Sequence, residues 1–131
     1  MVRVINALVI EDRKVLLCKK KEIWILPGGK KESGESDLEC LAREISEELP
    51  GTELDLDSAE IYGYFNGISP HRKQPIEVSV YLTERKVKNE LKTFAEITEA
   101  RFFCYDEMVG NDSIMGETRK IIERLRRENY F

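Results

Sequence analysis

Residues 29–48 read GKKESGESDLECLAREISEE, a polar loop followed by the pattern of an amphipathic helix. Ser36, with a glutamate three positions later, forms the capping-box pattern that begins many helices, because each side chain can satisfy a free backbone N–H. A helix over residues 37–49 then places its apolar residues on one side, and Pro50 and Gly51 end it. Those apolar residues are Leu38, Leu41, Ala42, Ile45 and Leu49. We therefore expect this helix to pack against a core directly after the polar loop.

A second face of the predicted helix carries three carboxylates, Glu44, Glu47 and Glu48. At 3.6 residues per turn they span roughly 100° of the helix circumference, beside the apolar face. Clustered carboxylates repel one another and disfavour a helix unless a cation neutralises them. Oxygen ligands alone suit Mg²⁺ or Mn²⁺ rather than zinc. Glu-rich helix faces are more often simply solvated, however, and the segment REISEE by itself favours that simpler interpretation.

The rest of the chain predicts an α+β fold. Apolar and β-branched runs indicate strands at residues 2–10, 15–18, 23–26, 53–64, 76–87 and 100–105, with a loop at residues 65–75. The first two strands are expected to form a hairpin. A second helix is predicted over residues 112–129, with an apolar face of Ile114, Met115, Ile121, Ile122 and Leu125. Strands, helix, strands and helix in this order favour an α/β/α sandwich over a doubly wound sheet.

Length and charge narrow the class of protein. The 131 residues correspond to one domain, so residues 1–131 are expected to form a single domain. Hydrophobic residues make up 41% and charged residues 35% of the chain, enough for one core under a charged surface. The net charge of −4 does not suit a protein that tracks a nucleic-acid backbone, so no nucleic-acid partner is expected. An acidic chain can still bind a polyphosphate when a divalent cation lies between them.

The cysteines and the N-terminus suggest a cytoplasmic protein. Cys18, Cys40 and Cys104 are far apart and form no CxxC or Cys/His cluster, which argues against a zinc site or a disulfide framework. Reduced, buried thiols are usual in the cytosol. The apolar run at the N-terminus is short and followed by charges, so it predicts a strand rather than a signal peptide. No apolar stretch approaches the length of a membrane span, and no membrane partner is expected.

The loop and helix of residues 29–48 resemble the signature of the Nudix hydrolase family, G-x5-E-x7-R-E-U-x-E-E-x-G-U, where U is a bulky apolar residue. The matching residues are Gly29, Glu35, Arg43, Glu44, Ile45, Glu47 and Glu48. The match over this longer stretch favours a functional site over a helix face that is merely solvated. Two positions at the end of the signature differ, because Pro50 stands where the family has glycine and Gly51 where it has an apolar residue. The departure concerns the loop after the helix and leaves the carboxylates intact.

The resemblance implies a Nudix-type α/β/α sandwich around a mixed β-sheet, with Mg²⁺ as cofactor and Mn²⁺ as a substitute. It implies that Glu47 and Glu48 are metal ligands, and that Glu44 is a third ligand or the base that activates water. The carbonyl oxygen of Gly28 is a further candidate ligand. Arg43 joins Glu44 and Glu47 as an expected catalytic residue, because it can orient a carboxylate through two hydrogen bonds.

Glu35 and Gly29 are expected to support this cluster from behind, as the surroundings of metal ligands commonly do. The resemblance implies attack of water on a phosphorus of a small nucleotide-like diphosphate. The general base varies within the family, and Glu96 and Glu99 are candidates for it outside the signature. Surface charge is the more frequent explanation for a glutamate in either position.

The short chain is most similar to the MutT-like branch, which converts nucleoside triphosphates, sometimes oxidised ones, to the monophosphate and pyrophosphate. Lys19 and Lys20 are candidate phosphate contacts, although an exposed turn explains them equally well. Asn111 lies in a segment that resembles the one that recognises the base in that branch. An asparagine side chain can form hydrogen bonds with two groups on a purine edge. In the competing interpretation, Asp112 or Ser113 simply caps the last helix.

Two alternatives remain open. The substrate can instead be ADP-ribose, another nucleotide sugar or a dinucleoside polyphosphate, cleaved by the same mechanism. In an alternative of another class, the chain is a non-catalytic Nudix-fold module that only binds nucleotides. Such modules typically lose one or more metal carboxylates, and the presence of all three here favours an enzyme. The sequence makes no prediction about the oligomeric state.

Overall fold

The computed structural model of the protein describes residues 1–69, 71, 73–114 and 116–131. The elements in chain order are β1 (Val2–Glu11), β2 (Lys14–Lys20), β3 (Ile23–Ile25), β4 (Gly28–Lys30), α1 (Asp37–Glu48), a 3-10 turn (Leu56–Ser58), β5 (Glu60–Ile68), β6 (Pro75–Thr83), β7 (Ile97–Phe103), α2 (Tyr105–Val109) and α3 (Glu117–Arg127). The strand order is β3-β2-β1-β6-β5, with β4 also pairing with β1 and β7 with β2. The sheet is mixed, because β1 and β6 run parallel while the other pairs are antiparallel.

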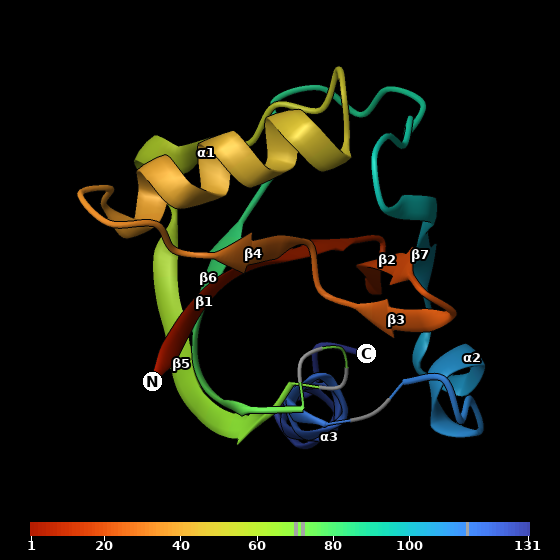
Figure 1. Ribbon diagram of the computed structural model, residues 1–131. Coiled ribbons are helices and arrows are strands. Elements are labelled where there is room, and N and C mark those ends of the chain that lie inside the picture. Colours follow the sequence, from red (N-terminus) through yellow and green to blue (C-terminus); the bar gives the residue numbers. More distant parts are fainter. Residues whose placement is uncertain (70, 72, 115) are drawn as a thin grey trace.

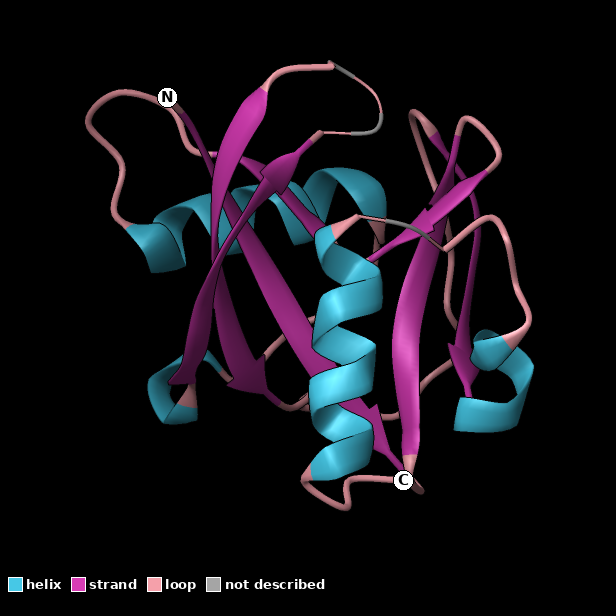
Figure 2. Ribbon diagram, turned by 90° about the horizontal axis from the view of Figure 1, so that it is seen from below, coloured by secondary structure: helices cyan, strands magenta, loops and turns pink. Residues whose placement is uncertain are grey.

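The two longer helices lie on opposite sides of this sheet (Figure 1). Helix α1 covers one face, and α3 lies within the curve of the other face, as the turned view in Figure 2 also shows. The arrangement confirms the predicted α/β/α sandwich and the α+β class. Among the described residues, no helix combines the length and apolar character needed to cross a bilayer.

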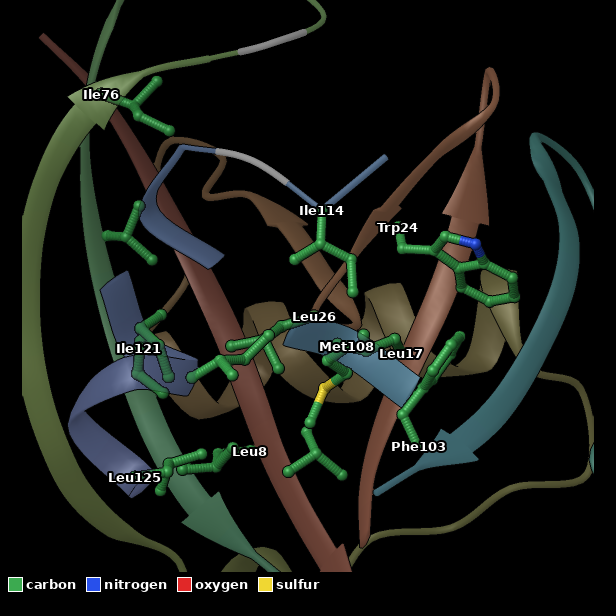
Figure 3. Close-up of a cluster of buried hydrophobic side chains, with 14 residues drawn as sticks. Leu8, Leu17, Trp24, Leu26, Ile76, Phe103, Met108, Ile114, Ile121 and Leu125 are labelled. Atoms are coloured by element: carbon green, nitrogen blue, oxygen red, sulfur yellow. The ribbon is translucent and has the colours of Figure 1, made fainter. Parts of the chain in front are cut away.

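Strand β1 separates two hydrophobic cores. Its alternate residues Ile5, Ala7 and Val9 pack in the core beneath α1, whereas Leu8 belongs to the core beneath α3. This follows from strand geometry, because successive side chains point to opposite faces of a sheet. In the α3 core, Trp24 and Phe103 meet edge to face, with 4.7 Å between ring centroids (Figure 3). Because β1 is buried on both faces, it holds the two helices in fixed positions relative to one another.

Helix α1 follows the sequence prediction closely. Ser36 is its N-cap, and the predicted capping box is present, with both reciprocal hydrogen bonds to Glu39 formed. The residues it buries are Cys40, Leu41, Ile45 and Glu48, with Leu49 buried directly after it. Ala42, expected on the apolar face, is exposed. The burial of Glu48 was not anticipated, and it matters for the site.

The prediction for residues 53–75 needs correction. The strand predicted at residues 53–64 begins later, at Glu60, after a 3-10 turn, and continues to Ile68. The loop predicted at residues 65–75 is accordingly shorter, because β5 pairs with β6 as far as Ile68 opposite Pro75. Pairing with a distant strand, rather than local residue preference, decides these bounds.

The last predicted helix also begins later than expected. Helix α3 starts at Glu117 with Gly116 as its N-cap, so the prediction that Asp112 or Ser113 caps it was wrong. A short helix that the sequence did not predict, α2, precedes it. The apolar face is confirmed for Ile121, Ile122 and Leu125, which are buried, whereas Ile114 is buried but precedes the helix. Met115, assigned to the same face, lies outside the described residues.

Candidate active site

Two glycines bring the sheet against helix α1. Residues Gly28 and Gly29 open β4, a short strand that the sequence analysis treated as a loop, and they pair with Asn6 and Ile5 of β1. A Cβ atom at Gly28 would lie 2.1 Å from the carbonyl oxygen of Ile5. At Gly29 it would lie 2.5 Å from the carboxyl carbon of Glu44. Only glycine fits at position 28, where the clash is with backbone, whereas a side chain at position 29 would displace the Glu44 carboxylate. The two missing side chains let the carboxylates of α1 approach the backbone of β4.

Glu48 is the most buried carboxylate of α1. The residue is 8% exposed, and the backbone N–H of Gly28 donates to its Oε1 at 3.4 Å. Burial, with repulsion by Glu44 as a second cause, raises the pKa of Glu48 to about 7. Within the described part of the chain no lysine or arginine forms a salt bridge with it. A buried carboxylate without a cationic partner is unfavourable, and a bound cation would relieve it.

Arg43 connects the helix to the preceding loop. Its Nε and Nη2 donate to the two oxygens of Glu35 at 3.1 and 2.7 Å, and its Nη1 donates to Glu44 at 3.0 Å. Nη2 also donates to the carbonyl oxygen of Lys30 at 3.1 Å. The Arg43 guanidinium, together with a hydrogen bond from the Glu32 backbone, lowers the pKa of Glu35 to about 2. The two-pronged ion pair fixes the side chain that orients Glu44.

The three carboxylates of α1 border one cavity of about 500 Å³. The cavity is lined by Lys20, Gly28, Gly29, Lys30, Glu32, Arg43, Glu44, Glu47, Glu48, Ala95 and Glu96. Glu47 lies at its open side, with a side chain that is 57% exposed and 3.6 Å from Arg43. Among the described residues, no three His, Cys, Asp or Glu side chains converge closely enough to hold one metal ion as they stand. The donor set nevertheless fits a hard divalent cation, since it consists of carboxylates and backbone oxygen around an uncompensated buried charge.

A family model described as the NUDIX domain matches residues 1–125 of the chain. The chain belongs to the Nudix hydrolase family. It is therefore an enzyme that hydrolyses nucleoside diphosphate-linked compounds, in a family that generally uses divalent metal ions and small nucleotide-like substrates. A search of curated proteins finds no match.

Solved structures share the Nudix fold over nearly the whole chain. A MutT Nudix hydrolase from Burkholderia pseudomallei is 24% identical, with a TM-score of 0.78 and coverage of 95% of this chain and 97% of that one. The MutT protein from Methanosarcina mazei Go1 is 25% identical, with a TM-score of 0.78 and coverage of 98% and 94%. A Nudix hydrolase from Nitrosomonas europaea is 18% identical, with a TM-score of 0.80 and coverage of 97% and 89%.

The departure from the Nudix signature after α1 has a local explanation. Gly51 has a φ of +85°, a left-handed conformation that favours glycine, and the backbone N–H of Thr52 donates to the carbonyl of Leu49 at 3.0 Å. The glycine of this Nudix chain therefore makes the turn one residue later than the signature places it. Pro50 is the second residue of this turn and does not line the cavity.

Of the two candidate phosphate contacts and the two candidate bases outside the signature, only one of each lines the cavity. Lys20 and Glu96 line the cavity and form an ion pair at 2.9 Å. Lys19 instead pairs with Glu22 at 3.3 Å, outside the cavity lining. Glu99 lies on β7 with a side chain that is 51% exposed, and it does not line the cavity. The fold thus places Lys20 and Glu96 beside the carboxylates of α1 and leaves Lys19 and Glu99 outside the cavity lining.

Asn111 lies apart from these carboxylates. Its Oδ1 accepts from the backbone N–H of Ser113 at 2.9 Å, a local turn that occupies the oxygen expected to read a base. Arg119 of α3 binds the carbonyl oxygen of Asn111 at 2.6 Å. Asn111 lines neither the catalytic cavity nor the narrower one beside it.

That narrower cavity contains residues that the sequence analysis did not select. Asn6, Ser69, His71 and Glu117 line it, and they come from three segments that are distant in sequence. A ring nitrogen of His71 lies 2.8 Å from the carbonyl oxygen of Lys20, so His71, within the loop predicted at residues 65–75, contacts the backbone of β2. No spacing pattern joins these four residues, and tertiary structure alone assembles them.

Proposed function

We propose that the protein hydrolyses nucleoside triphosphates, including oxidised ones, to the monophosphate and pyrophosphate in a reaction that requires Mg²⁺. The observation that carries the proposal is the cavity in which the three carboxylates of α1, the backbones of Gly28 and Gly29 and the side chain of Lys20 meet. Carboxylates alone would repel a polyphosphate, so they need a divalent cation, and Mn²⁺ has the same ligand preference as Mg²⁺. Lys20 adds the positive charge that a phosphate chain requires.

Glu47, Glu48 and the carbonyl oxygen of Gly28 would hold the cation, with Glu44 as a further ligand. The cation would neutralise phosphate charge and lower the pKa of a coordinated water. Glu44 lies half-buried against Gly29, with Arg43 donating to one of its oxygens. This contact favours one orientation of its carboxylate, which suits an acceptor for the proton of the attacking water.

The bond that breaks is the bridging P–O bond of the anhydride. Water oxygen attacks one of the two phosphorus atoms joined by this bond and its proton passes to a carboxylate. The bridging oxygen leaves with the other phosphorus, so the products are the monophosphate and pyrophosphate. Lys20 would bind the phosphate chain once its ion pair with Glu96 opens, because both side chains line the same cavity. Glu96, freed from Lys20, is the alternative proton acceptor to Glu44.

The experiment is a release assay with nucleoside triphosphates, their oxidised forms, ADP-ribose, nucleotide sugars and diadenosine polyphosphates, each with Mg²⁺ and with Mn²⁺. Glu48→Gln, which keeps the shape of a buried cavity residue, should lose activity by at least about a hundredfold. Glu60→Gln, an exposed glutamate of β5, is the matched control and should keep it.

Release of pyrophosphate from triphosphates, lost in the first variant only, supports the proposal. If the nucleotide sugars or dinucleoside polyphosphates are cleaved faster than the triphosphates, those compounds are the substrates and the triphosphate assignment is rejected. Tight binding of nucleotides with no cleavage would show a binding module and overturn the enzymatic proposal.

A further inference from the structure

A separate cavity lies against the side of α1 opposite to the catalytic carboxylates. In Figure 1 the chain turns back after α1 and runs to the start of β5. The outer cavity, of about 390 Å³, is lined by Ala42, Ile45 and Ser46 of the helix, by residues 51–54, 56 and 57 of the returning segment and by Lys86. At roughly 100° per residue, Ala42 and Ser46 lie across the helix from Glu44. The outer cavity shares no lining residue with the catalytic one, and its volume is typical of small-molecule sites.

Thr52 gives the outer cavity a polar side chain without a partner. The residue is 8% exposed, and its Oγ1 forms no hydrogen bond in the part of the chain that the structure describes. Buried hydroxyl groups are almost always hydrogen-bonded, because an unpaired one destabilises the fold. Valine has nearly the same shape without this cost. A ligand in the cavity that Thr52 lines would supply the missing partner and explain the threonine.

Apolar side chains form much of the remaining lining. Ile45 and Leu54 are 3% and 6% exposed and belong to the core beneath α1, and Leu56 packs against that core. Gly51 leaves space beside them, because a Cβ atom there would meet nothing within 4 Å. The Nudix signature has a bulky apolar residue at this position, so the open space accompanies the departure of this chain from the signature. The outer cavity therefore suits a ligand with an apolar body.

The charged residues of the outer cavity leave it negative. They are Glu53, Asp57 and Lys86. Lys86 donates to Glu53 at 3.0 Å, whereas Asp57 forms no salt bridge among the described residues. The hydrogen bond with Glu53 raises the pKa of Lys86, and the charges of Glu53, Asp55 and Asp57 act in the same direction. A cationic ligand would complement the remaining negative charge.

We propose that the outer cavity is a binding site for a small organic amine, separate from the substrate site and independent of which substrate the enzyme cleaves. The apolar body of the amine packs against Ile45 and Leu54, its ammonium group donates to the Thr52 hydroxyl, and Asp57 attracts its charge. An ammonium group has three donors and no acceptor, so it can satisfy a hydroxyl and still face carboxylates. An anion of the same shape is repelled, and a neutral alcohol lacks the attraction.

Three probes that share one ring test this charge preference, namely benzylamine, benzyl alcohol and benzoate. Each is titrated into the full chain at pH 7, and the backbone amide signals are followed by NMR. Benzylamine should shift the amides of residues 42–57 and bind about tenfold more tightly than benzyl alcohol, since hydrogen bonds between charged groups are the stronger ones. Benzoate should not bind there. Benzylamine binding should persist with Mg²⁺ and a nucleoside monophosphate present, because the two cavities are separate.

Variants then separate the site from general effects on folding. Thr52→Val should weaken benzylamine binding at least about fivefold without lowering the thermal midpoint of the free protein, since only an unpaired hydroxyl is removed. Thr118→Val is the matched control, because this hydroxyl on α3 is also buried and unpaired but does not line the outer cavity. It should leave benzylamine binding unchanged. Asp57→Asn should reduce the preference for benzylamine over benzyl alcohol.

Four outcomes would overturn the proposal. The first is the absence of amide shifts at residues 42–57 with millimolar benzylamine, and the second is equal affinity for all three probes. The third is an equal effect of Thr52→Val and Thr118→Val on binding. The fourth is displacement of benzylamine by the nucleotide, which would place the amine in the catalytic cavity. None of these measurements requires hydrolysis, so failure of the proposed function would leave the test of the amine site intact.

Discussion

Arg43 is the residue at which the polar contacts of the catalytic helix converge. It bonds both oxygens of Glu35, one oxygen of Glu44 and the carbonyl oxygen of Lys30. A guanidinium can serve all of these at once because its donors are fixed in a plane. The arrangement makes Arg43 a positioning residue, which acts on the reaction through the carboxylate that it holds.

Arg43→Lys should therefore reduce kcat by roughly 10–100-fold, the usual effect of removing a residue that orients metal ligands. KM should change little, because lysine retains the charge but cannot form the two-pronged contact with Glu35. Steady-state kinetics with the best substrate of the panel would measure both quantities. Arg127→Lys, an exposed change in α3, is the control. A rise in KM with unchanged kcat would contradict a positioning role.

The same contact predicts how stability depends on pH. The pKa of Glu35 falls from its ordinary value of 4.5 to about 2 in the folded protein, chiefly through its hydrogen bonds with Arg43. A lowered carboxyl pKa stabilises the fold above the unfolded value, and this contribution disappears as the pH falls toward the folded value. The native chain should exceed Glu35→Gln in free energy of unfolding at pH 6, and the difference should shrink between about pH 4.5 and 2. Urea unfolding at several pH values measures this, and a constant difference would refute it.

At the scale of single elements, α1 depends on its N-terminal cap. The Ser36 hydroxyl accepts from the backbone N–H of Glu39 at 3.1 Å. Ser36→Ala should lower the free energy of unfolding by about 1 kcal/mol, the usual effect of removing such a cap. Ser46→Ala, on an exposed position of the same helix, should be nearly neutral. Chemical denaturation of both variants checks the prediction, which equal stability losses would disprove.

Strand β4 requires a residue without a side chain where it faces α1. Gly29→Ala would place a Cβ atom 2.5 Å from the Glu44 carboxyl carbon and displace that carboxylate. We expect activity to fall at least about tenfold, since catalytic groups tolerate little misplacement. Gly110→Ala, where a Cβ meets nothing within 4 Å, is the matched control. Unchanged activity in Gly29→Ala would mean that the position of Glu44 is unimportant.

At the scale of the whole molecule, the sheet holds the ends of α1 and α3 around one pair of glycines. The catalytic cavity and the narrower cavity beside it meet there, and β1, buried on both faces, connects the two cores behind them. The uncompensated charges therefore belong to an assembled site rather than to one element. Any ligand that neutralises them binds the native state and not the unfolded chain.

Mg²⁺ or Mn²⁺ added to metal-free protein should accordingly raise the midpoint of thermal unfolding. Saturation at a hundredfold excess over the dissociation constant corresponds to about 2.7 kcal/mol. Thermal scans with increasing metal and with a chelator would measure the effect. Glu48→Gln should lose most of the metal-induced gain, whereas Glu60→Gln should keep it. No gain in the native chain would reject the metal site on α1.

The sequence alone determined the features that depend on local pattern. The capping box at Ser36, the helix over α1, the hairpin of β1 and β2 and the shared carboxylate face each follow from residues close together in the chain. The signature spacing also led to the correct family, because it joins a loop and a helix that are consecutive. Prediction from the sequence was least accurate where contacts between distant segments set the ends of an element, as in β5 and at the start of α3.

Only the tertiary structure decided which of the predicted side chains meet. Glu47 and Glu48 belong to the same carboxylate face of α1, but packing against β4 buries Glu48 and leaves Glu47 at the surface. Lys20 reaches the cavity and Lys19 does not, since adjacent residues of a strand point to opposite faces. The fold also buries Glu117, whose Oε2 has no hydrogen-bond partner among the described residues. Burial and pairing arise from contacts between distant segments, and a local sequence pattern cannot specify them.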